Sequence, residues 1–594
     1  MISVCRRRWL LRGEEGSLDH LSRLCADLGL SNLAGRALLL RGISSVEEGR
    51  EFISGRLAAL PDPFLMPGIE AATVRLASAI AQGEAISVHG DYDVDGITGA
   101  TLLTEVLRAF GARVDYHIPL RLRDGYGLSA VALRSAAAAG ARVVVSVDCG
   151  VSAAAEAQLA TELGIDLIIT DHHQPPAHLP PATAIVHPAL PGSAFPFAEL
   201  AGVGVAFFLL VALRKTLRES GAFTCRPEPD LRRWLDLVAL GTIADVVPLK
   251  GVNRLLTRAG LAVLAGGERP GIAALKEVAA VREVTCGVVG FRLAPRLNAV
   301  GRLEDAALGV DLLLTREQER AKAIAEQLDG FNQERQRIEK ETLSQAIERL
   351  EAGEGGARTI VLADSRWHSG VIGIVASRLV ERYHRPAVLI ALADGLGKGS
   401  ARAIAGFHLY RALQSCAAHL KGFGGHACAA GLTIDEENVS AFATAFEQVA
   451  REVLTEEDLL PRILHDGEIL FEEITEAKVR ELVVLAPFGA GNPEPAYVAL
   501  GVKISQIKTV GQNHLRFVAR QDGYSFPCIA FGMAERMTEL QGDIDLLFTP
   551  GINEWRDRSS VQLRIRDWRR SADAVDIGAP APPFASSGAM PAGA

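Results

Sequence analysis

The sequence predicts an α/β protein in which a domain with a mostly parallel sheet is joined by a long helix to a second α/β domain, followed by a small β-barrel. Three observations predict this order. Short apolar runs alternate with helical patterns between about residues 70 and 310. A charged, periodic stretch over 317–352 is typical of one long helix. Short strand-like runs separated by turn residues occupy 465–568.

The composition is that of a large globular protein. With 594 residues, of which 48% are hydrophobic and 22% charged, the chain is too long for one core. No apolar run approaches the roughly 20 residues that span a bilayer, and the one after Arg6-Arg7-Arg8 is too short for a secretion signal, so we expect a cytosolic protein. The eight cysteines form no Cys-X-X-Cys pair, which argues against a zinc ribbon. The net charge of −9 is unusual for a nucleic-acid-binding protein, but a basic cleft is compatible with an acidic surface.

Three of the expected strands end abruptly in aspartate and histidine. The strands Ala85–Val88, Val143–Val147 and Leu167–Thr170 are followed by His89-Gly-Asp91, Asp148 and Asp171-His172-His173. In open parallel sheets, ligands bind beyond the carboxyl ends of the strands. Aspartates that cap the following helices would explain any one of these ends, but they give no reason for the histidines. We therefore expect one site at this edge of the sheet.

The segment after the first of these strands holds Asp91, Asp93 and Asp95 within five residues. Such carboxylates repel one another and are best held together by a cation, and alternation places them on one side if the segment is extended. A calcium loop of the EF-hand type begins with the same spacing, but its twelfth position requires Glu and here holds Leu102. Asp and His ligands without thiolate favour Mn²⁺ or Mg²⁺. Two such ions about 4 Å apart can activate water and stabilise both oxygens of a phosphodiester displacement.

The order of these motifs resembles the DHH phosphoesterase superfamily. The matching segments are His89-X-X-X-Asp93-X-Asp95, then Asp148, then Asp171-His172-His173, then Gly241-Thr-Ile-Ala-Asp245. The resemblance implies metal ligation by the residues His89, Asp93, Asp95, Asp148, His172 and Asp245. It also implies that Asp148 bridges both metals and that His173 is catalytic beside the scissile phosphate. Asp91 is expected either to bind a metal itself or to contact the residues that do. Asp171 is expected to be a carboxylate that orients a histidine.

Two glycine-containing segments, Gly399-Ser400-Ala-Arg402 and Gly422 to Gly431 with His426, resemble the DHHA1 domain that partners DHH domains. Glycine-rich turns expose N–H groups to phosphate, which Arg also binds. Segments beginning at Arg121, Pro295 and Ala486 resemble RecJ exonucleases, and the resemblance covers roughly 70 to 568. It implies that nucleic-acid phosphate binds at the residues Arg121, Arg302, Ser400, Arg402 and His426. The alternative to phosphate binding is that Arg296 and Arg302 form ion pairs with carboxylates.

The same resemblance implies the domain boundaries. We expect an N-terminal helical region at 1–68, a DHH domain at 69–312, a connecting helix at 313–353, a DHHA1 domain at 354–456, an OB-fold at 457–569 and a disordered tail at 570–594. OB-folds bind single strands through a basic groove and stacked aromatic rings. The aromatic residues available here are Phe488, Phe517, Tyr524, Phe531 and Trp555, most of which we expect in the core.

Together these expectations predict an exonuclease that degrades single-stranded DNA in repair and recombination, with Mn²⁺ or Mg²⁺ as two-metal cofactor. The 5′ to 3′ polarity comes from the resemblance alone. The resemblance also implies a RecQ-type helicase and a single-strand-binding protein as partners, and we expect a monomer without membrane contact. One alternative is a phosphodiesterase of the same superfamily that acts on short oligonucleotides or cyclic dinucleotides. Another is a non-catalytic DNA-binding scaffold, which the intact motifs disfavour.

Overall fold

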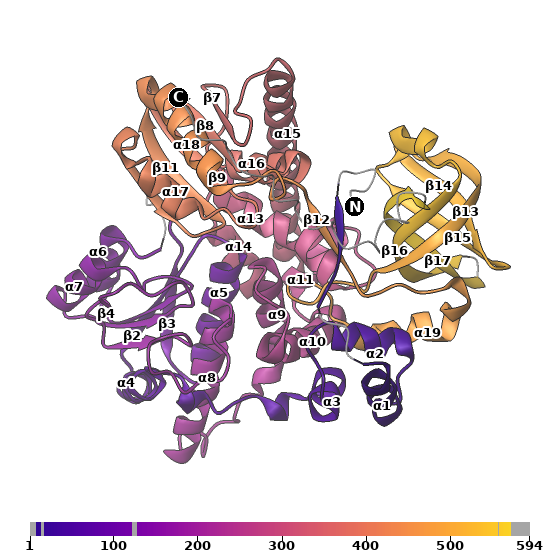
Figure 1. Cartoon of the computed structure of the whole chain (residues 1–594). Helices are drawn as coiled ribbons and strands as arrows, with labels where there is room; N and C mark the ends of the chain where they lie inside the picture. The colour runs from indigo at the N-terminus through magenta and orange to yellow at the C-terminus, as the bar shows by residue number, and fades with distance from the viewer. Residues whose placement is uncertain (1–6, 14–16, 121–126, 556–557, 572–594) are drawn as a thin grey trace, which may run out of the picture. The chain divides into compact units, whose positions relative to one another are not determined.

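The computed structural model describes residues 7–13, 17–120, 127–555 and 558–571, so nearly all of the tail expected at 570–594 lies outside the described residues. The chain forms two units (Figure 1). The larger unit holds residues 50–459 and 486–493, and the smaller one holds residues up to 49, 460–485 and those from 494 onward. In the described part of the chain, no single helix is long and apolar enough to cross a membrane, although the bent pair Leu57–Leu65 and Ile69–Gln82 passes that test together.

A five-stranded parallel sheet forms the first part of the larger unit, in the order β3-β2-β4-β5-β6. Its strands are β2 (Ala85–Gly90), β3 (Arg113–His117), β4 (Ala141–Val147), β5 (Asp166–Thr170) and β6 (Ala184–Val186). The chain runs outward from β2 to β3 and then returns to β4 on the other side. This reversal places a topological switch point between β2 and β4, where open sheets bind ligands.

Helices cover both faces of this sheet, as a parallel sheet requires. Successive residues of a strand point to opposite faces, so Val145 packs in one hydrophobic cluster and Val144 in another. The first cluster contains α4 (Ile69–Gln82), α5 (Val94–Ala109) and α8 (Gly202–Glu219). The second contains α6 (Ala130–Ala138) and α7 (Ala154–Glu162).

Further helices complete the DHH part of this unit. They are α9 (Leu235–Ala244), α10 (Gly251–Gly266), α11 (Pro270–Val278), α12 (Cys286–Val288), the π-helical turn η4 (Val289–Leu293), α13 (Ala294–Leu303) and α14 (Ala307–Leu314). The long helix α15 (Gln318–Glu351) follows with 34 residues. It confirms the helix expected over 317–352.

The second α/β part has a mixed sheet in the order β10-β11-β9-β8-β7. Its elements are β7 (Ile360–Asp364), α16 (Ile372–Tyr383), β8 (Ala387–Ala393), β9 (Leu396–Arg402), α17 (Leu409–Ser415), β10 (Gly422–Gly425), β11 (Ala429–Asp435) and α18 (Val439–Val453). The expectation that Gly399 and Gly422 belong to glycine-rich turns is wrong, because both lie in strands. A Cβ at Gly399 would approach a Leu432 methyl group to 2.6 Å, so this glycine makes room for a side chain of the next strand.

The smaller unit contains a closed barrel in the order β13-β14-β15-β17-β16. Its strands are β13 (Tyr497–Val510), β14 (His514–Gln521), β15 (Tyr524–Phe531), β16 (Asp543–Trp555) and β17 (Arg558–Arg570). Phe517 is buried in the barrel core, while Tyr524 and Phe531 are exposed.

The N-terminal residues pack in the same unit as the barrel. Strand β1 (Arg8–Leu11) pairs in parallel with β12 (Arg462–His465), and α1 (Leu18–Leu28), α2 (Asn32–Leu39) and the first residues of α3 (Val46–Ser54) follow. The hydroxyl of the buried Tyr497 donates to the Leu33 carbonyl at 3.0 Å. The buried Asp466 pairs with Arg12 at 2.9 Å and with Arg41 at 2.8 Å. The described residues up to 49 are therefore part of the barrel unit's core and ion-pair network. The short helix α19 (Glu476–Glu481) also belongs here.

Candidate active site

The aspartates after β2 lie on a turn that becomes a helix. Asp93 is the N-cap of α5, and its carboxylate accepts hydrogen bonds from the N–H groups of Asp95 and Gly96 at 2.9 and 3.1 Å. The condition of an extended segment is therefore not met, since Asp95 already lies in the first helical turn. The turn is tight, because a Cβ at Gly96 would approach the Asp91 carbonyl oxygen to 2.4 Å.

Asp148 stands at the end of β4 with a φ of +63°, a conformation that non-glycine residues rarely adopt outside strained sites. His172 Nε2 lies 3.0 Å from Asp148 Oδ1 and 3.6 Å from Asp245 Oδ2. The same nitrogen is 3.9 Å from Asp95 Oδ2. Side chains from the carboxyl ends of β2, β4, β5 and α9 thus meet in one place.

Three groups of potential metal ligands result, and within each group the ligand atoms lie within 4.8 Å of one another. The groups are Asp91-Asp93-Asp148, Asp148-His172-His173 and Asp95-His172-Asp245. Asp148 and His172 each belong to two groups, so neighbouring cations would share them. His89 is in none of these groups: its Nε2 is 3.0 Å from Ser87 Oγ, and its buried Nδ1 has no hydrogen-bond partner. Ligation by His89 stays a prediction.

The electrostatics of this cluster favour a bound cation. Burial raises the pKa of Asp95 to about 7 and that of Asp245 to about 9, and the charge of Asp93 adds to both shifts. Burial also raises the pKa of Asp148 well above its usual range. Asp245 Oδ2 is buried without a hydrogen-bond partner. Buried carboxylates that repel one another, together with an orphaned oxygen, fit the hard divalent ions Mn²⁺ and Mg²⁺.

Asp171 fixes the loop that carries the two histidines. Its Oδ1 accepts hydrogen bonds from the His172 N–H at 2.7 Å, the His173 N–H at 3.1 Å and His173 Nδ1 at 2.7 Å. Its Oδ2 accepts from the Val151 N–H at 2.9 Å. Burial opposes ionisation of Asp171, but the hydrogen bonds and the neighbouring imidazole prevail and lower its pKa to about 2. Asp171 therefore orients His173, as the sequence predicts.

Sequence reasoning missed two residues that support this cluster. The buried His187 follows β6 and donates from Nε2 to the His173 carbonyl at 2.7 Å, while its Nδ1 accepts from the Ala189 N–H at 3.0 Å. Gly202 begins α8, and its N–H donates to Asp95 at 2.6 Å. A Cβ at Gly202 would approach the Asp148 Cβ to 2.7 Å. The sequence feature that could have identified His187 is a fourth short strand, β6, which is followed directly by this histidine.

Ser400, Arg402 and the N-terminus of α16 form a second polar cluster, which we call the phosphate cluster. Ser400 and Arg402 lie on β9, and a Cβ at Gly373 would be 2.8 Å from Ser400 Oγ and 3.3 Å from Arg402 Nη2. A helix N-terminus with an adjacent Arg is suited to bind phosphate. The local sequence around Gly373 gives no sign of this contact, because nothing in it shows that β9 lies against α16.

The remaining predicted phosphate contacts have different surroundings. The ring of His426 lies 6.2 Å from that of His173, with 24° between the planes. Arg302 donates to the Gly370 carbonyl at 3.0 Å, next to the entrance of α16. Arg296 forms an ion pair with Asp329 at 2.8 Å, which is the carboxylate pairing considered as the alternative to phosphate binding. Arg121 lies outside the described residues.

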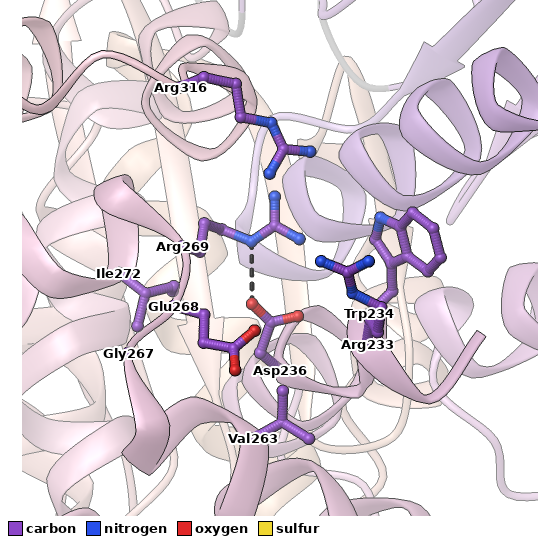
Figure 2. A pocket seen from close by; sticks show the side chains of 9 residues that line it. All are labelled: Arg233, Trp234, Asp236, Val263, Gly267, Glu268, Arg269, Ile272 and Arg316. Atoms are coloured by element: carbon purple, nitrogen blue, oxygen red, sulfur yellow. Dashed lines mark hydrogen bonds and ion pairs between the residues drawn. The ribbon is translucent and has the colours of Figure 1, made fainter. Parts of the chain in front are cut away.

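Figure 2 shows a separate cavity of about 280 Å³ in the larger unit. Arg269 lies in it and donates to Asp236 at 2.8 Å and to Glu105 at 2.9 Å. Glu105 also accepts from Arg316 at 2.6 Å and from the Trp234 indole at 2.7 Å. The residues that line the cavity include none of the metal cluster. Its buried charges pair with one another and link α5, α9 and the residues that flank α11 and α14.

The domains of the chain match three family models. They are the DHH family, N-terminal domain, over residues 85–242, the DHHA1 domain over 356–452 and the RecJ OB domain over 465–567. These matches confirm the predicted parallel-sheet domain, the second α/β domain and the barrel.

Whole-chain comparisons agree with the domain matches. The single-stranded-DNA-specific exonuclease RecJ of Bacillus subtilis is 38% identical over 570 residues, which are 95% of this chain and 71% of that protein. The protein of the same name from Escherichia coli is 39% identical over 567 residues, 92% of this chain and 97% of that protein. The crystal structure of RecJ in complex with Mn²⁺ from Thermus thermophilus superposes with a TM-score of 0.82 at 32% identity, covering 95% of this chain and 80% of that one. The chain therefore belongs to the RecJ family.

Proposed function

We propose that this protein is an exonuclease that hydrolyses single-stranded DNA from its 5′ end with two divalent cations, Mn²⁺ or Mg²⁺. The observation that carries the proposal is that carboxylate oxygens of Asp148 and Asp245 lie 3.0 and 3.6 Å from His172 Nε2. The relatives' names support the substrate, and the Mn²⁺ and Mg²⁺ complexes of the Thermus protein support the metals. Bound cations would polarise the phosphodiester and lower the pKa of an attacking water.

The side chains of this protein have distinct parts in that reaction. Asp148 and His172 belong to two ligand groups each and would keep two cations adjacent. His173 is held by Asp171 through Nδ1, which presents Nε2 as the donor to a phosphate oxygen. Burial opposes protonation of His173, but its hydrogen bond to Asp171 and the neighbouring carboxylates prevail, and its pKa is raised. A protonated imidazole there would stabilise the negative charge that develops on the phosphate.

The phosphate cluster of Ser400, Arg402 and the α16 N-terminus would hold the strand end. A terminal phosphate carries more negative charge than an internal diester, so a helix N-terminus and a guanidinium select the terminus. In the smaller unit, the exposed Tyr524 and Phe531 of the barrel are candidates for stacking on bases.

A nuclease that digests single strands in the cytosol also requires another protein that produces single-stranded DNA from duplex DNA. We propose a helicase that unwinds duplex DNA and a single-strand-binding protein that covers the product as partners, with this chain acting as a monomer.

Digestion of end-labelled single strands, with and without a 5′ phosphate and in Mn²⁺ or Mg²⁺, tests the function. We expect label at the 5′ end to be released first, and faster from phosphorylated strands. Asp148→Asn should abolish digestion, whereas Asp394→Asn, at an exposed turn, should not. High activity on dinucleotides with none on long strands would instead support a phosphodiesterase for short substrates.

A further inference from the structure

Phe291 is 85% exposed, the highest value for a large apolar side chain in the described part of the chain. It lies in the π-helical turn η4, a rare element that is frequent at functional sites. A single exposed apolar residue needs no explanation. The surroundings of Phe291 do call for one, because the residue before it, Gly290, packs against α9, the helix that ends at the candidate metal ligand Asp245.

The backbone before Phe291 packs against that turn. A Cβ at Gly290 would lie 3.8 Å from the Ile243 side chain, two residues before Asp245. The residue after Asp245 is Val246, whose N–H donates to the Ile243 carbonyl at 3.3 Å. Val246 is 68% exposed and has a φ of +63°, which is strained for a β-branched residue. The exposed Val246 and the backbone beside the exposed Phe291 thus both adjoin the end of α9 that carries Asp245.

The segment that begins with Phe291 continues along the loop of Asp91 to Asp95, the metal loop, to the phosphate cluster of Ser400 and Arg402. Asn298 accepts a hydrogen bond from the Val94 N–H at 3.1 Å, and a Cβ at Gly301 would approach the Tyr92 carbonyl oxygen to 2.5 Å. Arg302, at the end of the segment, contacts Gly370 beside α16. The helical rise separates Phe291 from Arg302 by about 15 Å. Phe291 and the phosphate cluster therefore lie toward opposite ends of one segment, with the metal loop between them.

We propose that Phe291 stacks on a nucleobase of the bound single strand, on the far side of the metal cluster from the terminal phosphate. This inference rests on the proposed function. A strand whose end lies at Ser400 and Arg402 and whose next phosphodiester reaches the carboxylates continues toward Asp245, at the end of the helix that the Phe291 segment packs against. Stacking tolerates any base, because every base has a π-face, and so it suits hydrolysis without sequence preference.

The first test compares Phe291→Ala with Phe291→Trp in the full chain. We expect Phe291→Ala to raise the KM for single-stranded DNA about 5-fold or more, with kcat changed by less than about 2-fold, and Phe291→Trp to behave like the unchanged protein. Val131→Ala is the matched control, since Val131 is 69% exposed on α6. Equal KM values for Phe291→Ala and the unchanged protein would overturn the inference.

The second test replaces single nucleotides by abasic ones, position by position from the 5′ end. At one position, the abasic substrate should raise the KM of the unchanged protein as much as Phe291→Ala does, and combining both changes should add no further loss. Additive losses at every position would contradict stacking. If the unchanged protein digests no single strand at all, the proposed function fails; if it digests strands and Phe291→Ala does so equally well, only this inference fails.

Discussion

The imidazole rings of His426 and His173 face each other nearly in parallel, with centroids 6.2 Å apart. His173 follows β5 of the parallel sheet, whereas His426 follows β10 of the DHHA1 sheet. The turn that places His426 requires Gly425, which has a φ of +135° and whose Cβ would approach the Ala429 carbonyl oxygen to 2.5 Å. Both domains of the larger unit therefore contribute a histidine to one site.

From this pairing we predict that His426 acts on substrate and not on metal. His426→Ala should lower kcat/KM on single-stranded DNA by about 100-fold, the effect of losing a positioned proton donor or acceptor. Calorimetric Mn²⁺ affinity should be unchanged, because His426 is in none of the ligand groups. His408→Ala, an exposed histidine of the same domain, serves as control. Weakened Mn²⁺ binding in His426→Ala would contradict the assignment.

Asp171 should matter through the histidines that it orients. Asp171→Asn keeps the side-chain volume but places an amide donor against N–H groups that now donate to a carboxylate. Loss of such a supporting contact costs about 10- to 100-fold in metal affinity or activity. The same titration and digestion assays measure it. Asp166→Asn, at a half-exposed carboxylate on β5, should have little effect, and equal behaviour of the two variants would refute the role of Asp171.

The sequence predicts most of the sheet edge that forms the site. Strands β2, β4 and β5 were identifiable because buried parallel strands are continuous apolar runs, and polar residues mark where each run ends. Asp148 and His172 could be placed together because the carboxyl ends of parallel strands share an edge. The alternation considered for Asp91 to Asp95 does not apply, because the segment is not extended: Asp93 caps α5, and Asp95 lies in its first turn.

Other features depend on neighbours that are remote in sequence. The spacing of Gly399 resembles a turn, but its role is set by Leu432 on the adjacent strand. The four residues of β1 contain no information about their partner β12, which lies about 450 residues later. His187 donates to the His173 carbonyl, so its contribution depends on the course of the loop after β5, which contains His173. Local patterns therefore predicted the ligands better than the residues that support them.

The raised carboxylate pKa values predict how metal binding depends on pH. With a pKa of about 7 for Asp95 and about 9 for Asp245, against an ordinary value of 3.8, the metal-free folded protein holds protons that the unfolded chain releases. Its stability should therefore fall as pH rises above about 3.8, and the contribution of these groups should be lost completely by about pH 7 for Asp95 and about pH 9 for Asp245. Mn²⁺ displaces the same protons, so its affinity should increase over this window.

Thermal unfolding with EDTA and with Mn²⁺ between pH 6 and pH 9 would measure both effects. The Tm without metal should decrease with pH, and the gain in Tm from Mn²⁺ should increase. Asp245→Asn should flatten both slopes, since it removes one of the titrating groups. A metal-free Tm that rises across this range would contradict the raised pKa values that burial and the neighbouring carboxylates give to Asp95 and Asp245.

The charge network in Figure 2 should support stability and not catalysis. Arg269→Met removes the guanidinium that donates to the buried Asp236, and breaking a buried ion pair in this way costs about 3–5 kcal/mol of unfolding free energy. Arg232→Met breaks an exposed pair with Asp230 and should cost less than about 1 kcal/mol. Chemical denaturation compares the two variants. Because the network includes none of the metal cluster, the kcat/KM of folded Arg269→Met should equal that of the unchanged protein. A second change, Asp236→Asn, should recover part of the lost stability, because the remaining side chain is then neutral; no recovery would mean that Arg269 acts through packing and not through its charge.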